Sequence, residues 1–474
     1  MVNYNILSAR YATSGINDIF SEIGKIRLER ELWIAVMKTQ RKLGVDIPQK
    51  SIDAFEGAKE RIDLERIAEI EKKTKHDVKA RIEEFVIAAG TEEHIHKGMT
   101  ARDLTDNVEQ LQIKLASKVI IGKMVSILRH LVDKSKDYSN IVLTARTHHQ
   151  PAQPTLLGRR MSMWAEELYL HLVEFDRFVE EYPLRGIKGP IGTQFDMFTL
   201  LGSEAKVDEL EKQVAKSLGF ANVLDSTGQV YPRSLDYSLI SKLAALASAC
   251  ENFAKGMRLM AGYELVTEGF RKGQVGSSAM PHKMNTRSSE RICGFAELIK
   301  MYADGASRLA GDQWEEGDVS CSVIRRVILP DSFYSIDGLC ETVLTVLNQM
   351  GPYPIVIEKE YQKYSQFLAT TEVLMIAVKA GIGRERAHET IKKYAVAEAL
   401  AMREGKLPEL AEKLASDPEF KKAGITKEKI EKIFADKMHF VGNAKKQILE
   451  VEKKAKKLIS KYPKEAKYKA GDIL

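Results

Sequence analysis

A repeated spacing of apolar residues indicates that this chain folds into long helices. From position 239 to 260 the apolar residues follow alternating steps of four and three: Leu239, Leu243, Leu246, Cys250, Phe253, Met257 and Met260. That step places them on one stripe of a helix that packs in a bundle. A second stripe runs from Met161 to Val179 and gives one apolar face over about five turns. These two segments therefore predict helices that pack against neighbouring helices.

The same periodicity recurs along most of the chain. It indicates further helices over 21–43, 51–89, 108–138, 291–308 and 332–348. No stretch has the alternating pattern of several successive strands, so we expect an all-α fold. Breaks at 90–107 and 351–354 divide it into three helical domains, namely 1–99, a central long-helix bundle over 100–350, and 351–474. The Lys-rich tail of the last domain, from about Lys461, is expected to be poorly ordered.

Composition excludes several classes of function. The 72 basic and 66 acidic residues give a net charge of +6, which over 474 residues does not indicate a nucleic-acid-binding protein. The four cysteines lack metal-ligand spacing, and His94 and His96 have no third ligand nearby, so we expect no metal. No apolar run approaches the ~20 residues of a membrane span, and the first residues lack the apolar core of a secretion signal. We therefore expect a cytoplasmic protein with reduced thiols.

One polar segment between two long helical runs has the composition of a closing loop. It covers 269–290 and reads GFRKGQVGSSAMPHKMNTRSSE. Its three glycines allow backbone conformations that side chains forbid. The loop carries the hydroxyls of Ser277 and Ser278 and the ammonium of Lys283, which suits closure over an anionic substrate. A solvated connector between two helices is equally consistent with this composition.

Single histidines in two other segments are ambiguous on their own. His76 stands beside Asp77 in a highly charged run, where a solvated surface histidine is the usual case. A neighbouring carboxylate also orients an imidazole and tunes its charge. His148 lies in RTHHQPAQPT (146–155), where two prolines interrupt the helical pattern. Considered alone, it is better explained as a capping or buried hydrogen-bonded histidine.

Taken together, these segments resemble the fumarase/aspartase superfamily, and most closely its adenylosuccinate lyase family. The loop matches the superfamily signature at Gly276, Ser277, Met280, Lys283 and Asn285. The other matching segments follow in the family's order: SARYA (8–12), KHD (75–77), GMT (98–100), RTHHQPAQPT (146–155), TGQVYPR (227–233) and SERI (289–292). The resemblance therefore extends over nearly the whole chain.

Three positions depart from the commonest family pattern. Thr286 replaces a frequent proline, and Ala101 stands where a small hydroxyl residue often follows Thr100. Gly317 falls where many members carry a phosphate-binding arginine, which puts one phosphate contact in doubt. Ser322 and Arg326 still match the rest of that phosphate site.

The reaction that the resemblance implies is elimination of fumarate from a succinyl-substituted amine. A base must take a proton from the carbon next to a carboxylate, a cation must stabilise the resulting aci-carboxylate, and an acid must protonate the departing nitrogen. Preorganised electrostatics should contribute most, because charge accumulates on the carboxylate. Proton transfer by a positioned side chain typically contributes ~10²–10⁴-fold.

The resemblance also assigns roles to individual residues. Ser277 is expected to be the base, and His148 the acid. Lys283 supplies positive charge to the serine and the carboxylate, and Glu290 orients His148. His76 binds near the phosphate or assists proton transfer. The expected substrate-binding residues are Arg10, Tyr11, Arg291, Ser322 and Arg326 for the phosphate, Thr100, Thr147, Gln229 and Asn285 for the succinyl carboxylates or nearby groups, Lys75 and Asp77 beside the nucleotide, and also Ser278.

The resemblance further implies a homotetramer whose central helices form one bundle and whose active sites are shared between subunits. We expect it to act on adenylosuccinate, giving AMP and fumarate, and on the succinyl-aminoimidazole-carboxamide ribotide of purine biosynthesis, with no cofactor. The alternatives are a carboxymuconate cycloisomerase, another succinyl lyase, or a catalytically silent helical scaffold. An absolute need for the substrate phosphate would separate the adenylosuccinate reaction from the first two alternatives. The third alternative is disfavoured because Ser277, His148, Lys283 and Glu290 are all intact.

Overall fold

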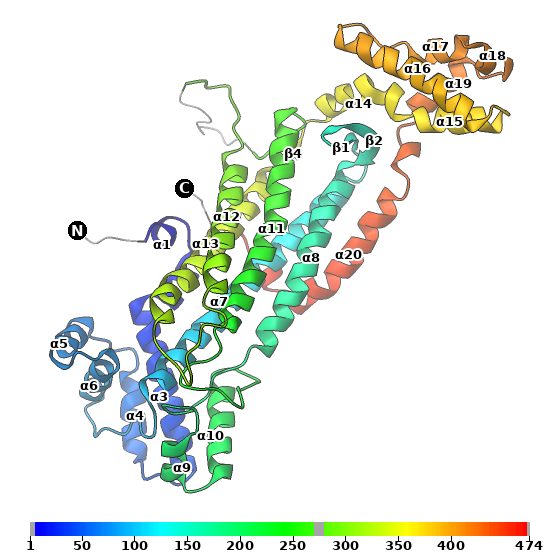
Figure 1. Ribbon diagram of the computed structural model, residues 1–474. Coiled ribbons are helices and arrows are strands. Elements are labelled where there is room, and N and C mark those ends of the chain that lie inside the picture. Colours follow the sequence, from blue (N-terminus) through cyan, green and yellow to red (C-terminus); the bar gives the residue numbers. More distant parts are fainter. Residues whose placement is uncertain (1–4, 270–278, 472–474) are drawn as a thin grey trace.

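The computed structural model describes residues 5–269 and 279–471 and is almost entirely helical there (Figure 1). The helices are α1 (Ile6–Arg10), α2 (Ser14–Phe20), α3 (Glu22–Lys42), α4 (Gln49–Ala58), α5 (Leu64–Thr74), α6 (Asp77–Ala89), α7 (Ala101–Asp137), α8 (Leu157–Glu181), α9 (Phe195–Leu201), α10 (Glu204–Ser217), α11 (Ser234–Gly262), α12 (Arg287–Ser307), α13 (Cys321–Gln349), α14 (Pro354–Leu368), α15 (Thr370–Lys379), α16 (Arg384–Arg403), α17 (Leu410–Ser416), α18 (Pro418–Lys422), α19 (Lys427–Ala435) and α20 (Ala444–Lys461), with short 3-10 helices η1 (His439–Val441) and η2 (Glu465–Lys467). The strands are β1 (Val142–Thr147), β2 (Gln150–Leu156), β3 (Val266–Thr267) and β4 (Gly351–Pro352). The predicted all-α class is confirmed.

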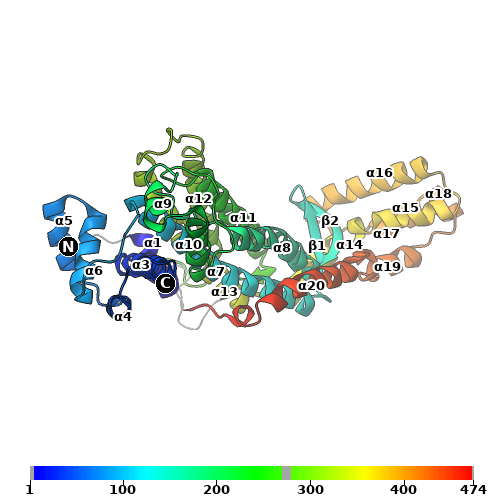
Figure 2. The same cartoon turned by 90° about the horizontal axis from the view of Figure 1, so that it is seen from below.

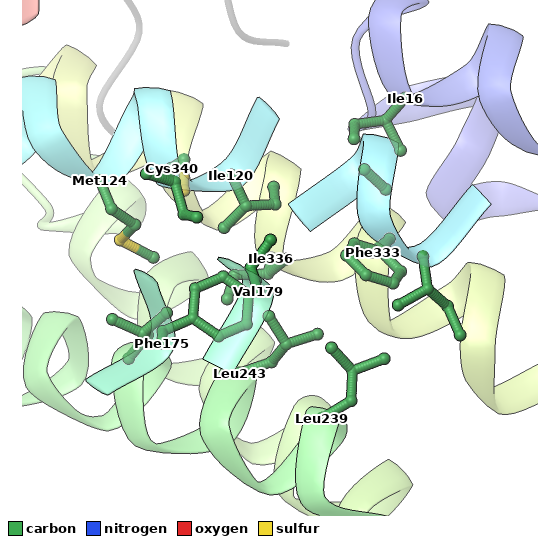
Figure 3. Packing of buried hydrophobic residues seen from close by; sticks show 14 of the residues in the cluster. Ile16, Ile120, Met124, Phe175, Val179, Leu239, Leu243, Phe333, Ile336 and Cys340 are labelled. Atoms are coloured by element: carbon green, nitrogen blue, oxygen red, sulfur yellow. The ribbon is translucent and has the colours of Figure 1, made fainter. Parts of the chain in front are cut away.

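Long helices of the central bundle carry the main core. Helix α11 packs against α12, α12 against α13, and α7 against both α8 and α13. Figure 3 shows the apolar residues that meet between four of these helices: Ile120 and Met124 of α7, Phe175 and Val179 of α8, Leu239 and Leu243 of α11, and Phe333, Ile336 and Cys340 of α13. Both stripes predicted from the sequence face this core, because every residue of the 239–260 stripe is buried, as are Met161 and Val179. Burying such side chains stabilises the fold by about 1.5–3 kcal/mol each.

Helix α7 begins seven residues before its predicted start. Thr100 and Asp103 form a capping box at its first turn, in which the Asp103 carboxylate accepts the Thr100 N–H at 2.8 Å. This pair satisfies backbone donors that a helix start leaves unpaired. The segment 90–107 was predicted to be a break, and its second part is therefore the start of the longest helix of the described chain.

The segment around His148 forms a β-hairpin that the sequence analysis did not anticipate. Strands β1 and β2 pair antiparallel, with Val142 opposite Leu156 and Thr147 opposite Gln150. The two residues between the strands, His148 and His149, have positive φ angles of 51° and 61°. Two consecutive positive φ angles are typical of the tight turns that join twisted strands.

Two further helix boundaries differ from the prediction. The run 51–89 forms three helices, because the chain turns after α4 and again at Lys75, whose φ of 54° ends α5 in the left-handed region. Helix α13 begins at Cys321 rather than near 332, and it continues through Pro330. A proline inside a helix removes a single N–H donor and crowds the preceding turn. Buried apolar residues on both sides of Pro330 hold this helix together.

Helices α14–α19 project from one end of the bundle, and α5 and α6 from the opposite end (Figure 2). Part of this C-terminal region has its own apolar core, which includes Val373, Leu414, Phe420 and Ile430. Helix α20 then returns along the bundle and packs on α7 and α8 (Figure 1). The three-domain division remains a prediction. Of the helices in the described ranges, none combines the length and the apolar character that a membrane crossing demands.

The Lys-rich end of the chain is packed, contrary to the expectation of poor order from about Lys461. The Arg129 guanidinium donates a hydrogen bond to the Ala466 carbonyl at 2.7 Å, and the Ser126 hydroxyl donates to the Tyr468 carbonyl at 2.9 Å. The tail therefore packs on α7 and, through the Gly471 N–H, on Glu341 of α13. Its lysines suggested a solvated tail, but Ala466 and the two nearby tyrosines provide apolar contacts with the core.

Candidate active site

One buried carboxylate, that of Glu268, holds the two ends of the loop 269–290 together. We call these ends, namely Glu268, Gly269, Ser288 and Ser289, the stem of the loop. Glu268 accepts the backbone N–H groups of Ser288 and Ser289, both at 2.9 Å, and the Ser289 hydroxyl at 2.8 Å. Beside it, β3 pairs with β4, with Val266 opposite Pro352. Gly269 has a φ of 104° and packs so closely on α13 that an added Cβ would come within 2.3 Å of the Gln349 Cβ. Both ends of the loop are thereby fixed to the bundle.

A pocket opens beside this stem. Its volume is about 490 Å³, and its lining includes Lys283 and Asn285 together with Glu264, Thr267 and Tyr353. Two residues expected to bind substrate carboxylates are thus brought to one cavity. The expected base Ser277 and its neighbour Ser278, like Gly276, lie outside the described residues.

Arg291 comes together with Arg10 and Tyr11, although about 280 positions of the chain separate it from them. The Arg10 and Arg291 guanidinium carbons lie 5.9 and 5.6 Å from the centre of the Tyr11 ring. Tyr11 in turn packs edge-on against Phe295, at 5.0 Å between ring centres. Burial lowers the pKa of Arg291, the Tyr11 phenol raises it, and the nearby Arg10 charge lowers it further. Between residues 5–269 and 279–471 no carboxylate forms an ion pair with either guanidinium. Two neighbouring unpaired cations are suited to hold a dianion such as a phosphate.

The hairpin tip carries Thr147 and His148, both exposed. Its neighbour His149 contacts Tyr263 at the end of α11, with 3.3 Å between the His149 Nε2 and the tyrosine oxygen. The Arg146 guanidinium lies 4.1 Å from the centre of the same tyrosine ring and pairs with Glu360 of α14. These contacts brace the turn at His149 and Arg146 and leave the expected acid, His148, open to solvent.

Asp103 organises the end of α7 where Thr100 lies. It accepts hydrogen bonds from the Arg185 guanidinium at 2.6 Å and from the backbone N–H groups of Lys188 and Gly189 at 2.9 and 3.0 Å. The buried Arg185 also donates to the Gly228 carbonyl at 3.0 Å. The connector that carries Gln229 is thereby anchored beside the start of α7. Sequence analysis missed Asp103 and Arg185, although an Asp three residues after Thr100 is a capping signal.

The loop around Gly317 lies directly against Gln229. The Gln229 N–H donates to the Glu316 carbonyl at 2.6 Å. Gly317 has a φ of 150°, and a Cβ there would lie 3.2 Å from the Gln229 Cβ. A side chain at 317 is therefore both conformationally strained and crowded, which explains why glycine stands at this position.

Arg325 fixes the first turns of α13, which carry Ser322 and Arg326. Its guanidinium donates to Asp236 at 2.7 Å and to Glu109 at 2.6 Å, and it also contacts the Tyr231 hydroxyl. Burial lowers the pKa of Arg325, but Asp236 and the other partners outweigh it, so this pKa lies well above its ordinary value. Arg326 is exposed, whereas Arg325 is buried. The sequence analysis singled out Arg326 and gave no role to the adjacent anchor.

His76 lies at the start of α6, between Lys75 and Asp77. Its Nδ1 accepts the Lys79 N–H at 3.2 Å, and the Asp77 carboxylate is 3.8 Å away. His76 is exposed and has the geometry of an N-cap residue. Burial lowers the pKa of His96, four residues before Thr100, and His76 lowers it further, whereas Asp103 raises it.

Among the described residues, one chain does not bring the His76 segment and the His148 segment together. Helix α6, which begins after His76, lies toward the first turn of α7, whereas the hairpin β1–β2 follows its last turn (Figure 1). At ~1.5 Å per residue, the 37 residues of α7 separate these two ends by about 55 Å. Glu290 is exposed on the first turn of α12, and no hydrogen bond within the described ranges joins it to His148. Nor do the described residues place three or more His, Cys, Asp or Glu side chains where they could hold a metal ion.

Comparisons with known proteins agree with the motifs. Residues 14–299 match a family described as "Lyase", and residues 366–451 match one described as "Adenylosuccinate lyase C-terminus". The chain is 35% identical over 422 residues to an adenylosuccinate lyase of Schizosaccharomyces pombe, with 87% of each chain covered. It is 33% identical to one of Saccharomyces cerevisiae, over 88% of this chain and 87% of the relative. An adenylosuccinate lyase of Caenorhabditis briggsae is 30% identical, over 97% of this chain and 96% of the relative.

Solved structures resemble the fold at lower identity. A 3-carboxy-cis,cis-muconate lactonizing enzyme from Pseudomonas putida has a TM-score of 0.81 at 17% identity, over 96% of this chain and 100% of that one. A fumarate lyase from Mesorhizobium has a TM-score of 0.79 at 18% identity, over 93% and 98%. At such identity the likeness concerns the fold alone, whereas the sequence relatives reach 30–35% identity over most of the chain. The chain belongs to the adenylosuccinate lyase family of the fumarase/aspartase superfamily.

Proposed function

We propose that this protein eliminates fumarate from adenylosuccinate, giving AMP, and from the corresponding succinyl-aminoimidazole-carboxamide ribotide. The observation that carries this proposal is the match to adenylosuccinate lyases in both parts of the chain, including the family-specific segment 366–451. Two guanidiniums beside Tyr11, which form no ion pair with residues 5–269 or 279–471, support a phosphate-bearing substrate. Lys283 and Asn285, in one pocket, support a substrate with carboxylates.

In the proposed mechanism Ser277 removes the proton from the carbon next to one succinyl carboxylate. The electrons of that C–H bond form an aci-carboxylate, which the Lys283 ammonium stabilises. The C–N bond then breaks, the C=C bond of fumarate forms, and His148 gives its proton to the departing nitrogen. Ser277 is a weak base at its ordinary pKa, so this step needs the nearby positive charge and a closed site. Glu290 orients His148, and His76 acts near the phosphate.

We also propose that the active protein is a homotetramer in which each site takes loops from several chains. The separation of about 55 Å along α7 supports this, because it keeps the His76 and His148 segments of one chain apart. Exposed apolar residues on α13, namely Val323, Ile324 and Val327, support burial of this helix against another subunit. The four cysteines are free and buried, which supports a reducing compartment such as the cytoplasm.

The near-ultraviolet absorbance of adenylosuccinate mixed with the purified protein tests the reaction. We expect loss of the substituted-purine signal with the wild type and no loss with Ser277→Ala. No change with a folded wild-type tetramer would contradict the proposed reaction. Activity that survives in Ser277→Ala would keep the function and exclude Ser277 as the base.

A further inference from the structure

A buried ion cluster lies between the N-terminal segment, the bundle and the C-terminal tail. Its centre is Lys123 of α7, which forms ion pairs with Asp337 and, at 2.8 Å, with Glu341, both on α13. All three side chains are at most 4% exposed. Burial lowers the pKa of Lys123, but the two carboxylates outweigh it and hold the pKa above its ordinary value. Lys123 is therefore charged at neutral pH.

The cluster holds the segment that follows Arg10 and Tyr11. The Asp337 carboxylate accepts the Thr13 N–H at 2.6 Å, and the Lys123 ammonium lies 3.2 Å from the Thr13 hydroxyl. The next residue, Gly338, forms the surface on which Tyr11 rests, because a Cβ there would lie 2.8 Å from the Tyr11 Cβ. Two consecutive residues of α13 thus fix both the Tyr11 ring and the backbone after it.

The C-terminal tail closes the other side of the cluster. The Tyr468 hydroxyl donates to one Glu341 oxygen at 2.6 Å, and the Gly471 N–H donates to the other at 2.9 Å. The Tyr468 ring lies 5.1 Å from the Lys123 ammonium. Its own carbonyl is held by Ser126 at 2.9 Å. The tail therefore supplies hydrogen bonds to a carboxylate whose other side-chain partner, among the residues that the structure describes, is Lys123.

Loss of a contact at one residue of this cluster should move the other residues, because each buried charge has few alternative partners. Loss of one hydrogen bond to a buried carboxylate lets the remaining ion pair shift, since a buried charge needs all its partners. A shift of Lys123 toward Glu341 would loosen its contacts with Asp337 and Thr13. The result would appear at Arg10 and Tyr11, three residues or fewer from Thr13.

We propose that Asp337 and Tyr468 are positioning residues for phosphate binding: the C-terminal tail, through Glu341, Lys123 and Asp337, holds Thr13 and with it the Arg10–Tyr11 segment. This inference rests on the proposed function, in which Arg10 and Tyr11 bind the substrate phosphate. It gives the C-terminal tail a role in substrate affinity that is separate from the chemistry at Ser277 and His148.

The test compares Tyr468→Phe with the matched control Tyr462→Phe. Tyr462 belongs to the same tail and also hydrogen-bonds a carboxylate, that of Asp176, but it does not touch the Lys123 cluster. The measurements are kcat and KM with adenylosuccinate, and inhibition by AMP, which carries the phosphate, and by fumarate, which does not. For Tyr468→Phe we expect KM and the AMP inhibition constant to rise roughly threefold to tenfold. We expect kcat and fumarate inhibition to change by less than about twofold, and Tyr462→Phe to match the wild type.

Asp337→Asn is the second variant, because it keeps an oxygen for the Thr13 N–H and removes the ion pair. It should repeat the selective loss of AMP affinity, and Tyr468→Phe decides if this variant does not fold. Equal effects of Tyr468→Phe and Tyr462→Phe, or equal weakening of AMP and fumarate, would overturn the inference and indicate general destabilisation. Unchanged AMP inhibition in a folded Tyr468→Phe would overturn it as well. A wild type without fumarate release would instead contradict the proposed function.

Discussion

The Glu268 carboxylate accepts two hydrogen bonds from Ser289, one from the serine N–H at 2.9 Å and one from the serine hydroxyl at 2.8 Å. These bonds join the residue just before the segment 269–290 to the first turn of α12 (Arg287–Ser307), which forms the end of that segment. The loop must present Lys283 to the substrate from this stem. The Glu268 carboxylate, which also lines this pocket, therefore lies in a position from which it holds both ends of the loop.

Replacing Glu268 by alanine should lower kcat by about 10- to 100-fold, because a displacement near 1 Å of a catalytic group has effects of that size. It also leaves buried donors at Ser288 and Ser289 without partners, which should cost about 1–3 kcal/mol of unfolding free energy each. Steady-state kinetics and denaturant unfolding measure both quantities. Glu297→Ala, which removes an exposed glutamate from α12, the helix that carries Ser288 and Ser289, is the control. A normal kcat in Glu268→Ala would show that the stem does not position the loop.

Mixing two inactive variants should restore activity if sites are shared between subunits. In a reassembled mixture of Ser277→Ala and His148→Ala chains, sites that take the two residues from different chains become intact with a frequency of about one quarter. The absorbance assay with adenylosuccinate measures the recovery. A mixture of Ser277→Ala with the double variant is the control and should stay inactive. An inactive mixture that mass spectrometry confirms as mixed tetramers would argue against shared sites.

Introducing the family's common arginine at Gly317 should impair the protein rather than improve phosphate binding. The φ of 150° and the 3.2 Å approach to the Gln229 Cβ leave no strain-free place for a side chain. Gly317→Ala brings the same strain without the charge. We expect both variants to raise KM for adenylosuccinate, with Gly317→Arg at least as strong as Gly317→Ala. A lower KM in Gly317→Arg alone would show that the loop accommodates the arginine.

The ion pair between Glu109 and Arg325 should make the free energy of unfolding decrease as the pH becomes acidic. Burial raises the pKa of Glu109, but Arg325 and Lys25 outweigh it and lower this pKa to about 2. A carboxylate whose pKa falls on folding adds stability above its unfolded pKa of 4.5 and loses it as the pH drops toward 2. The contribution near neutral pH is on the order of 3 kcal/mol.

Glu109→Gln should therefore be less stable than the wild type at pH 6, and the difference should shrink at pH 3. Urea unfolding at the two pH values measures it. The sign follows from the direction of the pKa shift, since protonation of Glu109 and removal of its charge by substitution have the same effect. A stability difference that stays constant between pH 6 and pH 3 would contradict this assignment.

The local pattern of the sequence was enough to predict the helices of the bundle. The stripes from Leu239 to Met260 and from Met161 to Val179 depend on residues three and four positions apart, which meet on a helix surface whatever the rest of the chain does. The same local pattern misled where tertiary contacts decide. Pro330 suggested a helix start after it, and the histidines and prolines of 146–155 concealed a hairpin.

The site divides in the same way. The order of its motifs was sufficient to identify the family, and it indicated Arg10, Tyr11 and Arg291 as one group, which the fold brings together. The sequence could not tell the buried Arg325 from its exposed neighbour Arg326, because adjacent residues of equal charge differ only in what surrounds them. The chain from about Lys461 was expected to be poorly ordered for the same reason, since its contacts with α7 and α13 are not visible in the sequence.

By itself, then, the sequence determined the helical periodicity, the fold class and the order of the chemical motifs. Only the tertiary structure decided which charges are paired and which remain open. Two hydrogen bonds form because separate segments of the chain pack side by side on the bundle. They join Tyr468 to Glu341 and Ser289 to Glu268. The physical reason is that a helix brings together residues of one short segment, whereas a buried hydrogen bond between remote segments depends on the path of the whole chain.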